Sequence, residues 1–250
     1  FFKQMFRRPK SEKFDHIFSG WSVWLEIAPE DAIELSPIME SLAEECGGSE
    51  KGVHNVPPHC TLLYNFSPPE SLKDQHESNL DKDALNTLRK EQEKYGQVML
   101  EKCRYKFHNN SSSSQNVKGS VSVKADSFFC FPYPKEADNG NGFGCIIPVF
   151  VLENSMSLRK IHFAALQTFP PDARHQCSNI TDMNDVHFSP HISLVYAPEA
   201  YEDYLATRTK TTLADSLNEI MKKPIRTRYL SLWSTQGLVK DWRRIAKIEI

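Results

Sequence analysis

The heptapeptide PHCTLLY occupies residues 58–64, and a near copy, PHISLVY, occupies residues 190–196. Each copy reads Pro-His-x-Thr/Ser-Leu-aliphatic-Tyr, and no other stretch of the chain resembles either one. Short apolar runs rich in strand-forming residues predict a buried β-strand at each copy. Side chains alternate between the two faces of a strand, so His59 should share one face with Thr61. In the second copy His191 and Ser193 should share a face in the same way.

This polar pair on an otherwise apolar strand favours a functional interpretation because it occurs twice. The bare pattern His-x-Thr/Ser also occurs at residues 76–78 and 187–189, but there it lacks the preceding proline and the apolar run. A single strand histidine is more often a hydrogen-bonded structural residue. Two imidazoles meeting in one cleft could supply a base for water and an acid for a leaving oxygen. The two hydroxyls could donate hydrogen bonds to a phosphate as charge develops on it.

The two motifs resemble the 2H phosphoesterases, a family named for its two His-x-Thr/Ser motifs. The closer likeness is to the plant-type cyclic phosphodiesterases. It is carried also by Trp21-Ser22-Val23-Trp24, by Glu45-Cys46-Gly47-Gly48, by residues 145–152 and by the closing segment 242–248. The resemblance spans most of residues 20–250, apart from inserted loops.

This resemblance implies metal-independent, cofactor-free hydrolysis of small cyclic phosphates. The substrates it implies are nucleoside 2′,3′-cyclic phosphates or ADP-ribose 1″,2″-cyclic phosphate, with a 2′-phosphate as product. It suggests His191 as the base and His59 as the acid, whereas the residues alone allow the reverse. Two other interpretations stay open. One is an enzyme of the same superfamily that processes RNA ends as an exonuclease or cleaves 2′,5′-phosphodiesters, and the other is a nucleotide-binding module without catalysis.

Two aromatic residues are further candidates for phosphate or substrate binding. The resemblance places Tyr196 near the phosphate, although alternation puts it on the face opposite His191, so the strand must twist or bulge there. Trp24 could stack on a base or ribose, or belong to the core. Residues 128, 129, 131 and 133 form an aromatic run that either lines the mouth of the cleft or packs internally.

Composition limits the class of protein. The chain has 250 residues, 40% of them hydrophobic and 25% charged, and a formal net charge of −2. Tight sequence-independent binding to long nucleic acid is not expected without a basic field. No apolar run is long enough to cross a membrane. The six cysteines have no C-x-x-C spacing, which predicts mostly free, buried thiols and no zinc site. The resemblance allows one or two of them to pair. We expect a cytoplasmic monomer acting on a small molecule, with RNA ends as alternative partners.

The pattern of elements predicts an α+β protein. After a tail at residues 1–19, one domain (20–250) should contain two related lobes, each a mostly antiparallel sheet backed by helices. The two histidine strands should face each other across a central cleft. Strands are expected at 21–27, 59–64, 97–107, 119–130, 145–152, 190–196, 225–233 and 243–250. Helices are expected at 155–168, at 199–221 and from Ser36-Pro37 to Gly47, with Gly96 ending a polar segment at 69–96. The segments 67–96, 109–118 and 131–144 exceed those of the small plant enzymes, which leaves substrate size open.

Overall fold

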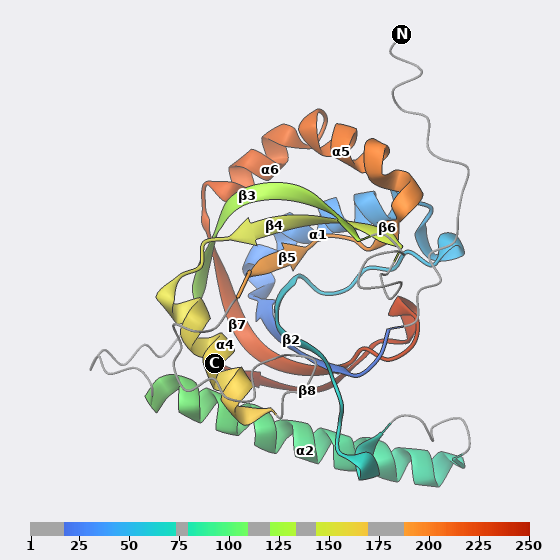
Figure 1. Ribbon diagram of the computed structural model, residues 1–250, viewed down its shortest axis with the longest axis vertical. Coiled ribbons are helices and arrows are strands. Elements are labelled where there is room, and N and C mark those ends of the chain that lie inside the picture. The colour runs from blue at the N-terminus through green and yellow to red at the C-terminus, as the bar shows by residue number, and fades with distance from the viewer. Residues whose placement is uncertain (1–17, 74–79, 110–120, 134–143, 170–187) are drawn as a thin grey trace.

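A computed structural model describes residues 18–73, 80–109, 121–133, 144–169 and 188–250 (Figure 1). Its strands are β1 (Trp21–Ile27), β2 (His59–Phe66), β3 (Ser122–Tyr133), β4 (Cys145–Leu152), β5 (His191–Ser193), β6 (Ala197–Pro198), β7 (Pro224–Ser234) and β8 (Arg243–Glu249). Its α-helices are α1 (Pro29–Glu45), α2 (Lys82–Asn109), α4 (Met156–Thr168), α5 (Glu202–Lys210) and α6 (Ala214–Met221). Short 3₁₀ turns lie at Gly48–Lys51, Glu70–Leu72, Glu199–Tyr201 and Val239–Asp241.

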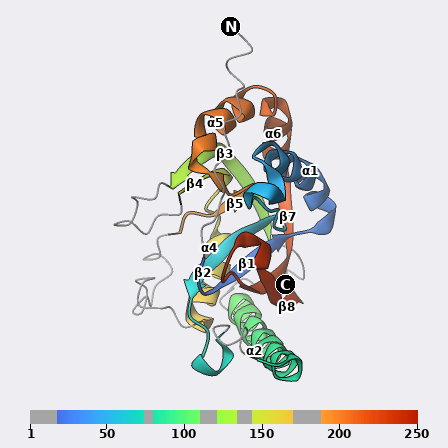
Figure 2. The same cartoon turned by 90° about the vertical axis from the view of Figure 1, so that its right-hand side faces the viewer.

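The described strands pair antiparallel throughout, which confirms the α+β prediction. Their order is β1-β2-β5-β4-β3-β7-β8, and β1 also pairs with β7, so the pairing closes into a circuit. The helices α5 and α6 pack on β3 at one end of the molecule, while α2 packs on β8 at the other (Figures 1 and 2). Because the strand pairing closes in this way, few of the described strands have an edge without a hydrogen-bonded neighbour.

One face of this sheet is the hydrophobic core. A continuous row of side chains, one from each of seven strands, runs across it in the observed register. Its members are Phe128, Phe150, Ile192, Cys60, Leu25, Leu230 and Ile248. The five from β4, β5, β2, β1 and β7 are all fully buried. Because neighbouring positions on each strand point the other way, the opposite face carries the polar residues of both motifs.

Helix α1 begins earlier than expected. Pro29, not Pro37, occupies the first turn, and Glu30 and Asp31 lie beside it, where acidic side chains favour the helix dipole. Pro37 is tolerated inside the helix. The predicted end is confirmed, because Gly47 follows with a φ of 100°, a conformation that glycine adopts without strain.

The expected strand at 97–107 is wrong, because this segment belongs to the long helix α2. Gly96, read as a terminator, lies inside it. The buried residues Gln92, Gly96, Leu100 and Cys103 follow helical spacing and form the contact face. Gly96 is small because β8 lies against it: a Cβ there would be 2.7 Å from the Cβ of Ala246.

Gly96→Ala tests this close contact, because two effects have opposite signs. Helix propensity alone would stabilise the protein by about 1 kcal/mol. The clash with Ala246 should outweigh that gain and lower the free energy of unfolding, since overpacking costs about 1–3 kcal/mol. Urea unfolding measures the sign directly. A stabilised variant would show that α2 does not approach β8 in this way.

Several other boundaries differ from the expectation. Ser155 caps α4 by accepting a hydrogen bond from the amide of Leu158, but Met156, expected on its inner edge, is 53% exposed. The expected helix at 199–221 divides into a 3₁₀ turn, α5 and α6. The second histidine strand is only three residues long. The segment 131–133 belongs to β3 rather than to a loop, whereas 110–120 and 134–143 lie outside the described residues.

The histidine strands do not face each other across a cleft. They are neighbours in the sheet and pair through Cys60 and Ile192, because the circuit brings β5 between β2 and β4. The expected tail ends slightly earlier, since Phe18 already bridges to Gly237. Residues 1–17 lie outside the described part of the chain.

Two expectations drawn from the composition can be compared with the described residues. None of the helices they form is long and apolar enough to cross a membrane. The five cysteines among them are free thiols, four of them buried, while Cys177 lies outside that part of the chain.

Candidate active site

The register between β2 and β5 brings both motifs together. Cys60 is opposite Ile192, so one residue to either side His59 is opposite Ser193 and Thr61 is opposite His191. All four side chains therefore point to the face opposite the one that carries Cys60 and Ile192. The two histidines are diagonal neighbours, which corresponds to about 7–8 Å between their backbones.

Two rows of side chains cross this polar face, which we call the site face. The first runs Ser127, Val151, His191, Thr61, Trp24, Ser231 and Lys247. The second runs Phe129, Val149, Ser193, His59, Glu26, Tyr229 and Glu249. The site face thus places the motif residues at its centre, with Trp24 and Glu26 as their neighbours on β1.

The same backbone contact orients both histidines. The Nδ1 atom of His59 lies 2.7 Å from the carbonyl oxygen of Pro57, and the Nδ1 atom of His191 lies 2.9 Å from that of Ser189. In each copy a proline separates the histidine from this carbonyl, and a residue before proline is held extended. The two prolines are also held in the same way. The carbonyl oxygen of Pro58 accepts a hydrogen bond from the amide of Ile27, and that of Pro190 accepts one from the amide of Leu152.

These contacts fix the chemistry of each ring. A carbonyl oxygen can only accept, so Nδ1 of His59 and of His191 carries the proton that it donates. In the neutral ring Nε2 is then the free lone pair, and in the cation Nε2–H is the available acid. Both rings therefore present the same nitrogen for proton transfer.

The two imidazoles differ in their surroundings. His59 is 1% exposed, and Trp24 stacks on it with ring centroids 3.5 Å apart and planes within 10°. Burial lowers the pKa of His59 to about 3, against the hydrogen bond to Pro57, and the nearby His191 lowers it further. His59 is consequently neutral at physiological pH. His191 is only partly buried.

The lowered pKa of His59 should make the fold sensitive to acid. Between its unfolded pKa near 6.5 and its folded value of about 3, the unfolded chain binds a proton that the folded protein does not. The free energy of unfolding should therefore decrease as pH falls through that interval. Urea unfolding from pH 7 to pH 4 should show a shallower decrease for His59→Gln than for the unmodified chain. Burial also lowers the pKa of His162, to about 4, so some decrease should remain. Equal slopes in both proteins would contradict the assignment.

Tyr196 lies beside Ser193 of the second motif. The chain leaves β5 after Ser193, and this break in the alternation turns the Tyr196 phenol back to hydrogen-bond with the Ser193 side chain. Burial raises the pKa of Tyr196 to about 12, so the phenol keeps its proton and can donate. Its ring packs edge-on against Trp242, which also packs against Trp24.

Trp24 is a core residue that supports the site. It is 2% exposed and stacks on Trp233 as well as on His59. Little of the ring is therefore accessible to a base or a ribose. Its contact with His59 instead holds that imidazole in place.

A buried carboxylate near His59 was missed by the sequence analysis. Glu26, the cross-strand partner of His59, is 5% exposed and accepts a hydrogen bond of 3.2 Å from Nε1 of Trp233. Nη1 of Arg244 lies 3.4 Å and 3.3 Å from the two carboxylate oxygens of Glu26. Arg244 also lies over the Trp233 ring, 5.8 Å from its centroid. Glu26 thus anchors a cation on β8, and only the strand pairing reveals it.

Other features of the described residues do not coincide with the motifs. No group of three or more potential metal-ligating side chains occurs among them. A surface hollow of about 540 Å³ lies between β3 and α6, lined largely by charged residues, but it contains no motif residue. Its ion pairs, Lys124 with Glu153 and Lys222 with Glu219, are exposed.

Comparison of the chain with models of known protein families finds no match. No curated protein matches it either.

Proposed function

We propose that this chain is a metal-independent hydrolase of cyclic phosphates that uses two histidines as acid and base. The observation that carries the proposal is the placement of His59, Thr61, His191 and Ser193 on one face of two paired strands. The matching Nδ1 contacts of the two histidines support it. Two imidazoles supply both proton transfers, so the scheme needs neither metal nor cofactor.

A phosphate bound between the two Nε2 atoms would receive hydrogen bonds from Thr61, Ser193 and Tyr196. Neutral His59 fits the base that takes a proton from the attacking water. The more accessible His191 then protonates the leaving ring oxygen. This assignment reverses the one implied by the resemblance, and its physical reason is the desolvation of His59.

The architecture proposed with this function is the 2H phosphoesterase fold, two pseudo-symmetric lobes around the site. The repeated order of elements supports it: β1, α1, β2 and α2 in the first half correspond to β4, α4, β5 and the pair α5–α6 in the second. Each half supplies one histidine strand. We propose a cytoplasmic monomer with a nucleoside 2′,3′-cyclic phosphate or ADP-ribose 1″,2″-cyclic phosphate as substrate.

A substrate panel in EDTA tests this function. The purified chain should open nucleoside 2′,3′-cyclic phosphates in excess EDTA, with modest dependence on salt. Turnover that EDTA abolished and Mg²⁺ or Zn²⁺ restored would contradict the mechanism. A steep decrease of kcat/KM with salt would favour processing of RNA ends, and binding without turnover would favour a nucleotide-binding module.

A further inference from the structure

Three aromatic side chains on β3 form an exposed strip. Phe129 is 51% exposed and Phe131 is 44% exposed, and Tyr133 is partly buried. The rings of Phe129 and Phe131 meet edge to face at 6.3 Å, and Phe131 stacks with Tyr133 at 6.0 Å. We call these three residues the aromatic strip. Exposure of adjacent large apolar rings is unusual for a surface without a ligand.

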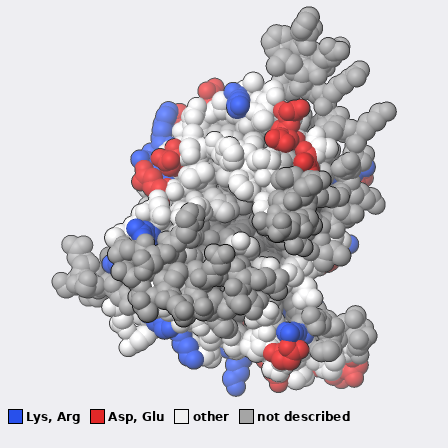
Figure 3. All heavy atoms as spheres, viewed as in Figure 1, with Lys and Arg blue, Asp and Glu red and all other residues white. Residues whose placement is uncertain are grey.

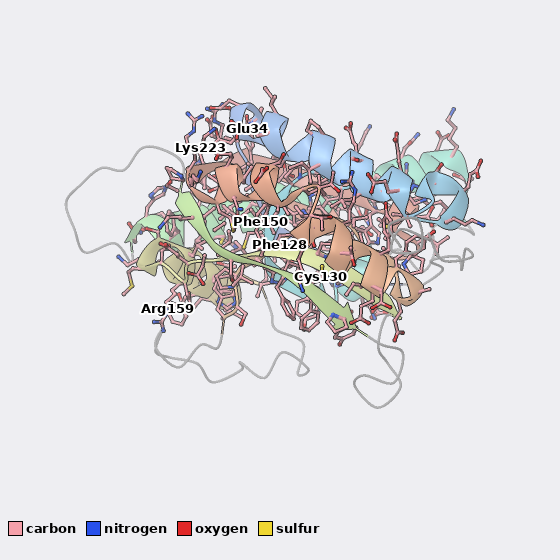
Figure 4. The ribbon with its side chains drawn as sticks, turned by 90° about the horizontal axis from the view of Figure 1, so that it is seen from above. Glu34, Phe128, Cys130, Phe150, Arg159 and Lys223 are labelled. Atoms are coloured by element: carbon pink, nitrogen blue, oxygen red, sulfur yellow. The ribbon has the colours of Figure 1, made fainter. Side chains whose placement is uncertain are left out.

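The aromatic strip lies on the site face. Phe129 pairs with Val149, which pairs with Ser193, so all three side chains point the same way. The alternate residues of β3 point to the helices instead: Phe128 packs edge-on against Phe150, and Cys130 contacts Thr209 of α5. Figure 4 shows Phe128 and Cys130 along β3, with Phe150 beside Phe128. Core packing therefore explains the inward rings and the partly buried Tyr133, but not the exposure of Phe129 and Phe131.

The strand order sets the distance from the strip to the histidines. A phosphate held between His59 and His191 would lie between β2 and β5, whereas the strip lies on β3, beyond β4. At about 4.8 Å per strand, the separation along the sheet is roughly 12 Å. The base on the sugar that carries a cyclic phosphate is much closer to the phosphorus than this. A base one sugar–phosphate unit further along would reach the strip.

The chemistry of the strip suits a base better than it suits a charged group. Aromatic rings stack on any nucleobase and contribute about 1–3 kcal/mol per base. In the view of Figure 3 the described surface over the middle of β3 and β4 is mostly uncharged, and acidic side chains lie to its right. Stacking rather than ion pairing would therefore hold the ligand there.

The geometry points to the aromatic strip as a binding site for a nucleobase that is separated from the cyclic phosphate by one sugar–phosphate unit. This inference rests on the proposed function and names its substrate as larger than a mononucleotide. Two ligands place a base beyond the sugar that carries the cyclic phosphate: an RNA 3′ end with a 2′,3′-cyclic phosphate, where one phosphate links the two sugars, and ADP-ribose 1″,2″-cyclic phosphate, where a pyrophosphate links them.

Phe129→Ala and Phe131→Ala test the strip, with Tyr105→Ala as the control. Tyr105 is 69% exposed on α2, which packs on β8. The substrates are adenosine 2′,3′-cyclic phosphate, an adenylate dinucleotide ending in a 2′,3′-cyclic phosphate, and ADP-ribose 1″,2″-cyclic phosphate. Each phenylalanine variant should lower kcat/KM for at least one of the two larger substrates by roughly 5–150-fold, the equivalent of one lost stack. The mononucleotide should change less than twofold, and Tyr105→Ala should change nothing. The larger substrate whose kcat/KM falls in the phenylalanine variants is the ligand of the strip.

Equal losses on all three substrates, or no loss on any, would overturn this role of the strip and leave cyclic phosphate hydrolysis intact. Failure of the unmodified chain to hydrolyse any of the three would instead contradict the proposed function. In that case the base-binding role of the strip is tested without turnover, by calorimetry of the binding of a dinucleotide with a terminal 2′-phosphate. Weaker binding to Phe129→Ala with unchanged binding of adenosine 2′-phosphate would support it, and equal affinities would overturn it.

Discussion

Replacing either His59 or His191 by alanine should lower kcat/KM for a cyclic phosphate by about 10²–10⁴-fold, the usual contribution of one proton-transfer group. Because the pair acts as a unit, the double variant should be little worse than the worse single one. Thr61→Ala and Ser193→Ala should cost less, on the order of 10–10³-fold, since each removes one hydrogen bond to the phosphate. The dependence of kcat/KM on pH should be bell-shaped for the unmodified chain.

Two control variants accompany these substitutions. His108 is exposed on the last turn of α2, so His108→Ala should leave turnover unchanged. His187 carries the bare His-x-Ser pattern outside the repeated heptapeptide. A folded His187→Ala variant as inactive as His191→Ala would invalidate the second motif.

The leaving group distinguishes the acid from the base. With a phosphodiester whose leaving group is p-nitrophenolate, protonation of the departing oxygen is no longer needed. His191→Ala should then recover most of its activity, while His59→Ala should stay impaired. The opposite pattern would restore His191 as the base and His59 as the acid.

Trp24→Ala should produce the largest loss of stability among the site residues. Trp24 is 2% exposed and stacks on both His59 and Trp233, and removal of a buried tryptophan side chain costs about 3–5 kcal/mol. Urea unfolding measures this change. The exposed Tyr105→Ala should stay within about 0.5 kcal/mol of the unmodified chain. A Trp24→Ala protein of normal stability that has lost only its preference among bases would show that Trp24 stacks on the substrate instead.

The sequence was sufficient to predict the structure of a segment where the local pattern of residues determines it. The alternation in residues 58–64 placed Cys60 and His59 on opposite faces of one strand, and the structure agrees. The strands at 21–27 and 145–152 were predicted with the observed boundaries. In such segments the residue types that favour burial fit the geometry of a strand, so a single sequence is enough to predict the strand.

Prediction failed where a distant contact decides the outcome. Gly96 was taken to end a polar segment, but its small size serves the approach of β8, about 150 residues later in the chain. Glu26 and Arg244 are 218 positions apart, and neither belongs to a motif. The pairing of β2 with β5 likewise depends on partners that a single strand sequence does not specify. Both motifs could therefore be found from the sequence, but not their arrangement as neighbours.

Nuclear magnetic resonance of the imidazole rings tests the central claim most directly, because it locates the ligand without turnover. Titration with adenosine 2′-phosphate should shift the Nε2 resonances of His59 and His191 together and raise the pKa of His59 as the anion binds beside it. The resonances of His108 and His162 should not move. A shift at only one of the two motif histidines, or at neither, would contradict a shared phosphate site between them.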